Sequence, residues 1–103
     1  AINIPNNGYI ECLPKDIVVE VPGIINKSGI SGISFKNYPA AFGSLLNSQS
    51  GVIQMTTDAV LNASKHSAYL ALLADPVVND SYQAEKLLNN MLETQGKFLY
   101  YLK

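Results

Sequence analysis

The sequence predicts an α+β fold: a β-hairpin, a small antiparallel sheet, that packs with two or three helices. Residues 9–13 and 17–21 are short runs of β-branched and aromatic residues that alternate with polar ones, and a proline-containing connection separates them. This pattern is typical of a hairpin. After the hairpin, apolar residues recur with the helical period of 3.6. Strands followed by helices in this order are typical of an α+β domain.

The length of the chain, 103 residues, predicts one domain that spans residues 1–103. Hydrophobic residues make up 48% of the chain and charged residues only 15%. That is a large apolar share for a small domain, so part of the apolar surface is expected to meet a partner. The pattern begins abruptly at Ala1, almost inside a strand, and we expect the chain to be a fragment of a longer one.

The charge pattern excludes several classes of partner. The formal net charge is −1, and the seven basic residues are scattered from Lys15 to Lys103. The sequence has no basic stripe of the kind that binds nucleic acid or anionic lipid, and no apolar run is long enough to span a membrane.

Cys12 is the only cysteine, so it forms no internal disulfide and no thiol cluster for zinc. A reducing, cytoplasmic location is expected.

Residues 24–36 are rich in glycine and serine, and we expect an ordered loop with one short strand at residues 30–35. The spacing Gly29-x-x-Gly32 resembles part of a phosphate-binding loop. The third glycine and the following lysine of such a loop are absent, so a turn is the better interpretation.

The second half of the chain is predicted to be helical. Pro39 is placed to open a helix, which residues 48–51 interrupt or kink. One apolar stripe then predicts a single long helix over residues 52–75, rich in alanine and therefore packed closely against a neighbour. Asp80, with Gln83 three residues later, resembles a capping box that opens the last helix.

Isolated side chains that could carry chemistry have simpler interpretations. His66 is the only histidine and has no catalytic partner at helical spacing, so a packing or half-exposed role is favoured. Cys12 has no adjacent base and is predicted to be a buried packing residue. Glu11 and Glu20 could form a carboxylate pair, but their positions favour a charged, solvent-facing side of the sheet.

Asn6, Asn7 and Gly8 are the one site-like group. Consecutive asparagines at a strand entrance either close a turn or point their amides into a cleft. Both alternatives stay open from the residues alone, and these three positions are the candidates for an active-site-facing segment.

An ordered series of short motifs resembles the C-terminal domain of family 4 glycoside hydrolases. The similarity runs from Asn3 to about Leu92, most of the chain. It is carried by Asn7-Gly8-x-Ile10-x-x-Leu13-Pro14-x-Asp16-x-Val18-Val19-Glu20-Val21-Pro22, Gly29-Ile30, Tyr38-Pro39, Leu45-Leu46-x-x-Gln49, Asp58-Ala59 and Ala71-Leu72-Leu73-Ala74-Asp75-Pro76. Cys12 departs from the pattern, since the family usually has asparagine there.

The resemblance implies the chemistry of a longer chain. Family 4 enzymes are α-galactosidases, α-glucosidases and 6-phospho-glycosidases that use NAD and a divalent metal such as manganese in an oxidation and elimination mechanism. Their domain is shaped like the C-terminal domain of lactate and malate dehydrogenases. The cofactor loop, the metal ligands and the catalytic tyrosine lie upstream in such chains, so no catalytic, cofactor-binding or metal-binding residue is assigned here. The implied partners are the remainder of the glycosidase and further copies in a homo-oligomer.

Two alternatives remain at this point. One is a non-catalytic interaction or oligomerisation module. The other is the C-terminal piece of a 2-hydroxy-acid dehydrogenase, against which residues 18–22 and the helix end at Asp75-Pro76 argue. Nothing in the segment chooses among a glucoside, a galactoside, a uronide and a phosphorylated sugar.

Overall fold

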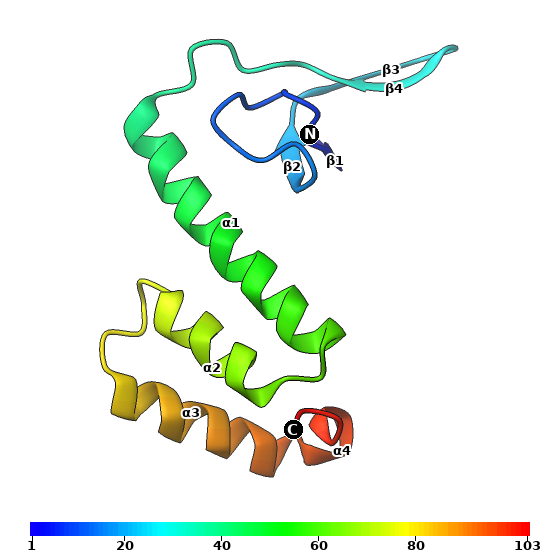
Figure 1. Cartoon of the computed structure of the whole chain (residues 1–103). Coiled ribbons are helices and arrows are strands. Elements are labelled where there is room, and N and C mark those ends of the chain that lie inside the picture. Colours follow the sequence, from blue (N-terminus) through cyan, green and yellow to red (C-terminus); the bar gives the residue numbers. More distant parts are fainter. The chain divides into compact units, whose positions relative to one another are not determined.

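All residues from 1 to 103 are described by the computed structural model, which Figure 1 shows as a ribbon. The chain divides into two units, Ala1–Ser50 and Gly51–Lys103. Strands occupy the first unit and helices most of the second, which confirms the α+β class. The elements are β1 (Ile2–Pro5), β2 (Val18–Val21), β3 (Gly23–Asn26), β4 (Gly29–Gly32), α1 (Ala40–Leu61), α2 (Lys65–Ala74), α3 (Ser81–Thr94) and α4 (Gly96–Leu99).

The first sheet pairs β1 with β2 in antiparallel register, from Ile2 opposite Val21 to Pro5 opposite Val18. The hairpin predicted from residues 9–13 and 17–21 is therefore wrong in its first strand, which lies at the very start of the chain. Residues 9–13 belong instead to the loop between β1 and β2. The alternation misleads because Ile10 and Leu13 are buried from a loop, three residues apart, and not from the pleat of a strand.

The core of the first unit lies under this sheet and loop. Val19 and Val21 point inward from β2 with 7% and 1% exposure, and Ile10 and Leu13 join them from the loop. Along β2 the buried and exposed positions alternate, as a strand covered on one face requires.

A second hairpin, β3–β4, occupies the segment predicted to be mostly loop. A two-residue connection joins Asn26 to Gly29, and the Asn26 Oδ1 accepts a hydrogen bond of 2.8 Å from the backbone N–H of Ser28. Gly29 has a φ of 118°, which closes the connection. The predicted short strand at residues 30–35 is confirmed only over residues 30–32, which lie in β4. Its partner β3 was not predicted, because the hairpin is exposed on both faces and so shows no apolar alternation.

Helix α1 begins after Pro39, whose carbonyl accepts the N–H of Gly43 at 2.9 Å, as the proline predicted. It continues through residues 48–51, so the predicted interruption there is wrong. Gly51 lies in this stretch, and a glycine inside a helix lowers its stability by about 1 kcal/mol relative to alanine. The helix nevertheless continues on both sides of Gly51.

The single helix predicted over residues 52–75 is instead two helices. Helix α1 ends at Leu61 and α2 begins at Lys65. Between them Ala63 adopts a φ of 52°, and the Ser64 side chain caps α2 by accepting the N–H of Ser67 at 3.1 Å. The periodic stripe continues through this break, and for that reason periodicity alone did not reveal it.

The predicted cap at Asp80 is confirmed, because its Oδ1 accepts the N–H of Tyr82 at 2.8 Å and α3 begins at Ser81. In the second unit α2 and α3 lie side by side and run in opposite directions (Figure 1). Their buried side chains are small or aliphatic: Ala71, Ala84 and Leu88. None of the helices combines the length and the apolar character that crossing a bilayer requires.

Candidate functional site

The loop between β1 and β2 is built around the side chain of Asn6, which is 0% exposed. Its Nδ2 donates to the carbonyls of Ile10 and Leu13 at 3.0 Å and of Pro14 at 2.9 Å. Its Oδ1 accepts the N–H of Ile10 at 2.8 Å. A buried amide must have its donors and acceptor satisfied, and here one amide supplies the partners for three loop carbonyls. The Asn6 side chain is therefore used inside the loop.

Asn7 and Gly8 turn the chain. Their φ angles are 42° and 93°, in the left-handed region that asparagine and glycine adopt most readily. The N–H of Tyr9 donates to the carbonyl of Asn6 at 2.7 Å and closes the turn. The turn interpretation of these residues is thus confirmed. That Asn7 and Gly8 also border an active site stays a prediction; the Asn7 side chain is exposed and Gly8 is half-buried.

The loop is held against the second hairpin by Tyr9. The backbone N–H of Gly32 donates to the Tyr9 hydroxyl at 3.4 Å, and a Cβ on Gly32 would lie 2.8 Å from the Tyr9 ring. The N–H of Phe35 donates to the carbonyl of Tyr9 at 2.8 Å. These contacts join segments more than twenty residues apart, so local sequence reasoning missed them. Gly32 can be recognised as a contact of the Tyr9 ring only when it is known that these two segments lie side by side.

The other candidate residues do not come together. Cys12 is exposed in the loop, so the prediction of a buried strand residue was wrong, although its side chain lies against Gly43. Glu11 and Glu20 are both exposed, as predicted, and His66 is exposed on α2. No group of three or more His, Cys, Asp or Glu side chains is placed to hold a metal ion.

The second unit contains two hollows. The first, about 230 Å³ in volume, is apolar except for Thr56, Asp75 and the hydroxyl of Tyr101. It is lined by Val52, Thr56, Ala59, Val60, Ala68, Ala71, Leu72, Asp75, Leu88, Met91, Leu99, Tyr101 and Leu102. The Thr56 hydroxyl donates to the carbonyl of Val52, and the Asp75 Oδ1 accepts the N–H of Val77. Neither bond joins two of the polar lining groups into an acid–base or nucleophilic pair, so we interpret this cavity as part of the packing of the helices.

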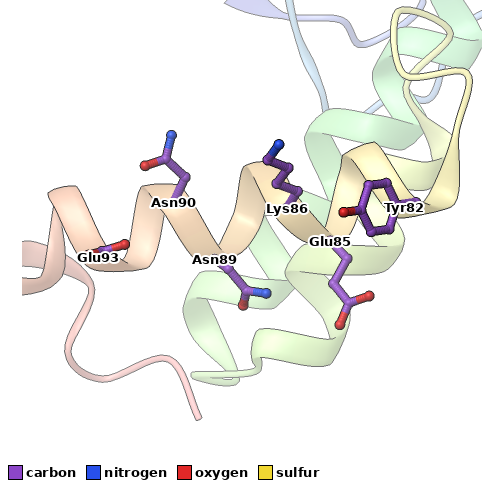
Figure 2. A pocket seen from close by; sticks show the side chains of 6 residues that line it. All are labelled: Tyr82, Glu85, Lys86, Asn89, Asn90 and Glu93. Carbon is purple, nitrogen blue, oxygen red and sulfur yellow. The ribbon is translucent and has the colours of Figure 1, made fainter.

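The second hollow, about 640 Å³, lies along the outer side of α3. Figure 2 shows that all its side chains come from that one helix: Tyr82, Glu85, Lys86, Asn89, Asn90 and Glu93. A region lined by a single helix face does not enclose a ligand, since ligand sites are concave and bury most of the ligand surface. We interpret it as the solvated face of α3.

Comparison with known proteins decides the family. The profile described as "Family 4 glycosyl hydrolase C-terminal domain" matches residues 1–78. The chain belongs to family 4 of the glycosyl hydrolases. The resemblance predicted from the ordered motifs is confirmed, and so is the α+β fold expected for this family 4 domain.

Relatives extend the family 4 match beyond residue 78. The α-glucosidase of Erwinia rhapontici is 39% identical over 103 residues, which cover all of this chain and 22% of that protein. The α-galactosidase of Rhizobium meliloti (strain 1021) is 30% identical over 100 residues, or 94% of this chain and 20% of that protein. The family 4 segment described here spans about a fifth of the length of these relatives.

A solved structure shares the backbone of this family 4 chain. It is a 6-phospho-α-glucosidase from gut microorganisms in complex with NAD and glucose-6-phosphate, and it superposes with a TM-score of 0.85 at 28% identity. The alignment covers 98% of this chain and 22% of the solved one. The same backbone therefore occurs there as about a fifth of a longer polypeptide.

Proposed function

We propose that this chain is the C-terminal part of a glycosidase that cleaves O-glycosidic bonds in carbohydrate metabolism. The observation that carries the proposal is the family 4 match over residues 1–78. The relatives named above support it, because both carry the names of glycosidases.

The proposed reaction is a transient oxidation of the sugar by NAD followed by elimination, with a divalent metal such as manganese. The NAD in the 6-phospho-α-glucosidase complex supports the nucleotide part of this proposal. The residues of this chain do not fit either group by themselves. No carboxylate, thiol and imidazole cluster is present for a metal, and Gly29 and Gly32 lie in a hairpin rather than before a helix.

This segment therefore has a structural role in the proposed enzyme, and the redox and metal chemistry belongs to residues outside it. The Asn6-centred loop is the part of the segment that we propose to border the active site, through Asn7 and Gly8. The Asn7 side chain is exposed and Gly8 is half-buried, and the loop that carries both is held together by the buried amide of Asn6.

We further propose a homo-oligomeric enzyme located in the cytoplasm. A single free cysteine at an exposed position is compatible with a reducing compartment. The low charged content, 15%, is compatible with apolar contacts between subunits.

A segment exchange tests the proposed function. The matching 103 residues of the Erwinia rhapontici α-glucosidase are replaced by this chain, and α-glucoside hydrolysis is measured with NAD and manganese. We expect activity within about tenfold of the unaltered enzyme, or about 1.4 kcal/mol of activation free energy. Deletion of the segment serves as the control and should abolish activity. An exchanged enzyme that is folded by circular dichroism but inactive would contradict the proposal.

A further inference from the structure

Helix α1 has very few charges for its length. Asp58 is the only charged residue among its 22, with no acidic residue in the first turn and no basic residue in the last. A helix at a protein surface normally turns charged and polar residues toward water. The composition of α1 is instead typical of a helix that protein covers on more than one side.

Within the first unit, one side of α1 is covered and another is not. Gly43 and Ser50 are buried on the inner side. Phe42, Leu45 and Leu46, which we name the α1 apolar face, are 62%, 66% and 39% exposed. Residues at spacings of three and four lie next to one another on a helix, so these side chains form one continuous surface.

Single exposed apolar side chains are ordinary on soluble proteins, whereas a continuous apolar face on a helix with one charged residue is not. A membrane does not explain this face. No helix of the chain is suited to crossing a bilayer, and a helix that lies on a membrane carries lysine and arginine on its polar side, which α1 lacks. The face therefore fits another protein surface.

We infer that the α1 apolar face is the surface on which the remaining part of a family 4 glycosidase chain packs. This inference rests on the proposed function. It is supported by the solved 6-phospho-α-glucosidase, in which the same backbone makes up only 22% of the polypeptide. The occupant contributes an apolar and uncharged surface, because residues 40–57 of this chain offer no charge with which to pair.

The exposed fraction of Leu45 in a full-length chain measures the packing directly. In the exchanged Erwinia rhapontici α-glucosidase, Leu45→Cys is compared with the matched control Ser44→Cys. Cysteine is a small, apolar residue that places a reactive thiol at either position. Ser44 is also exposed on α1 but lies nearly opposite the α1 apolar face, since each residue advances about 100° around the helix. The rate of alkylation by N-ethylmaleimide is followed by mass spectrometry of the peptide that carries each position.

We expect the thiol of the Leu45→Cys variant to react at least about tenfold more slowly than that of Ser44→Cys, because its reaction requires local opening. Both should react at the same rate in urea. Equal rates in the folded enzyme would overturn the inference even where the exchanged enzyme is active. Protection that disappears when the enzyme is diluted to the monomer would also overturn it and would assign the face to a second copy. Activity of the exchanged enzyme tests the proposed function separately.

Discussion

Asn6 ties together the loop between β1 and β2. Its amide pairs with the carbonyls of Ile10, Leu13 and Pro14 and with the N–H of Ile10. No buried side-chain nitrogen or oxygen of the chain is left without a partner. Removal of the Asn6 amide would leave several loop carbonyls and an N–H unpaired in a low-dielectric environment. The loss of stability should therefore exceed that of an average hydrogen bond.

We therefore expect Asn6→Ala to lower the free energy of unfolding by about 2–3 kcal/mol or more. The matched control is Asn3→Ala on β1, where the asparagine is exposed and a change within about 0.5 kcal/mol is expected. Urea unfolding followed by circular dichroism measures both. Equal effects of the two substitutions would show that the loop does not depend on the Asn6 amide.

The single helix predicted over residues 52–75 places Ala63 on its closely packed inner stripe, where a larger side chain would overpack. The structure places it at the break between α1 and α2 with a φ of 52°. A residue with a Cβ in the left-handed region stores strain of about 1 kcal/mol or more, which glycine relieves. We expect Ala63→Gly to raise the free energy of unfolding by up to about 1 kcal/mol.

The same substitution at Ala59 should have the opposite sign. Ala59 lies inside α1 and is 2% exposed, so Ala59→Gly loses packing and lowers stability by at least about 1 kcal/mol. Thermal unfolding of the two variants checks the pair. A loss of stability from Ala63→Gly would mean that the break at residues 62–64 does not form.

At the scale of elements, the contact between the loop and α1 depends on Gly43. A Cβ placed on Gly43 would lie 2.5 Å from the Cys12 Sγ and 3.3 Å from its Cβ. Alanine would otherwise favour the helix by up to about 1 kcal/mol. We expect Gly43→Ala to destabilise the protein, and the same change to stabilise it in a Cys12→Ala background, with a coupling of about 1 kcal/mol or more.

The control for this cycle is Gly51→Ala, because nothing lies within 4 Å of a Cβ built there. It should raise stability by about 0.5–1 kcal/mol whether or not Cys12 is present. Urea midpoints of the six variants and backgrounds give the comparison. Independent, additive effects at Cys12 and Gly43 would show that the loop does not pack on α1 through this contact.

The starts of α1 and α3 were predicted from local sequence signals, whereas the break between α1 and α2 was not. Pro39 and Asp80 predicted the starts of α1 and α3 because a helix start is determined by hydrogen bonds within one turn. The break at residues 62–64 was not predicted, since Ala63 continues the apolar stripe and a left-handed alanine has no sequence signature. The cap at Ser64 is a signal that could have revealed it.

At the scale of the whole molecule, the catalytic competence of the isolated chain can be tested. Its residues form no metal cluster and no glycine-rich strand–turn–helix. We expect the purified 103 residues neither to bind NAD in a calorimetric titration nor to hydrolyse nitrophenyl glycosides with NAD and manganese. Turnover above that of a buffer control would contradict the structural role proposed for this segment.

The candidate site was predictable only in part. The sequence indicated Asn6, Asn7 and Gly8 as a special group because consecutive asparagines before glycine favour a left-handed turn. It left open whether the amides close the turn or face a cleft. The direction of the Asn6 side chain was determined by carbonyls at positions 10, 13 and 14, whose placement depends on how the loop folds over the core.

By itself the sequence determined the family, the α+β class and the helix starts at Pro39 and Asp80. An ordered series of short motifs identifies a family without knowledge of contacts, and caps act over three or four residues. Only the tertiary structure decided that residues 2–5 pair with β2, that residues 23–32 form a hairpin and that Asn6 is buried. Strand pairing and burial depend on which distant segments meet, because an apolar residue becomes part of a core only when another segment covers it.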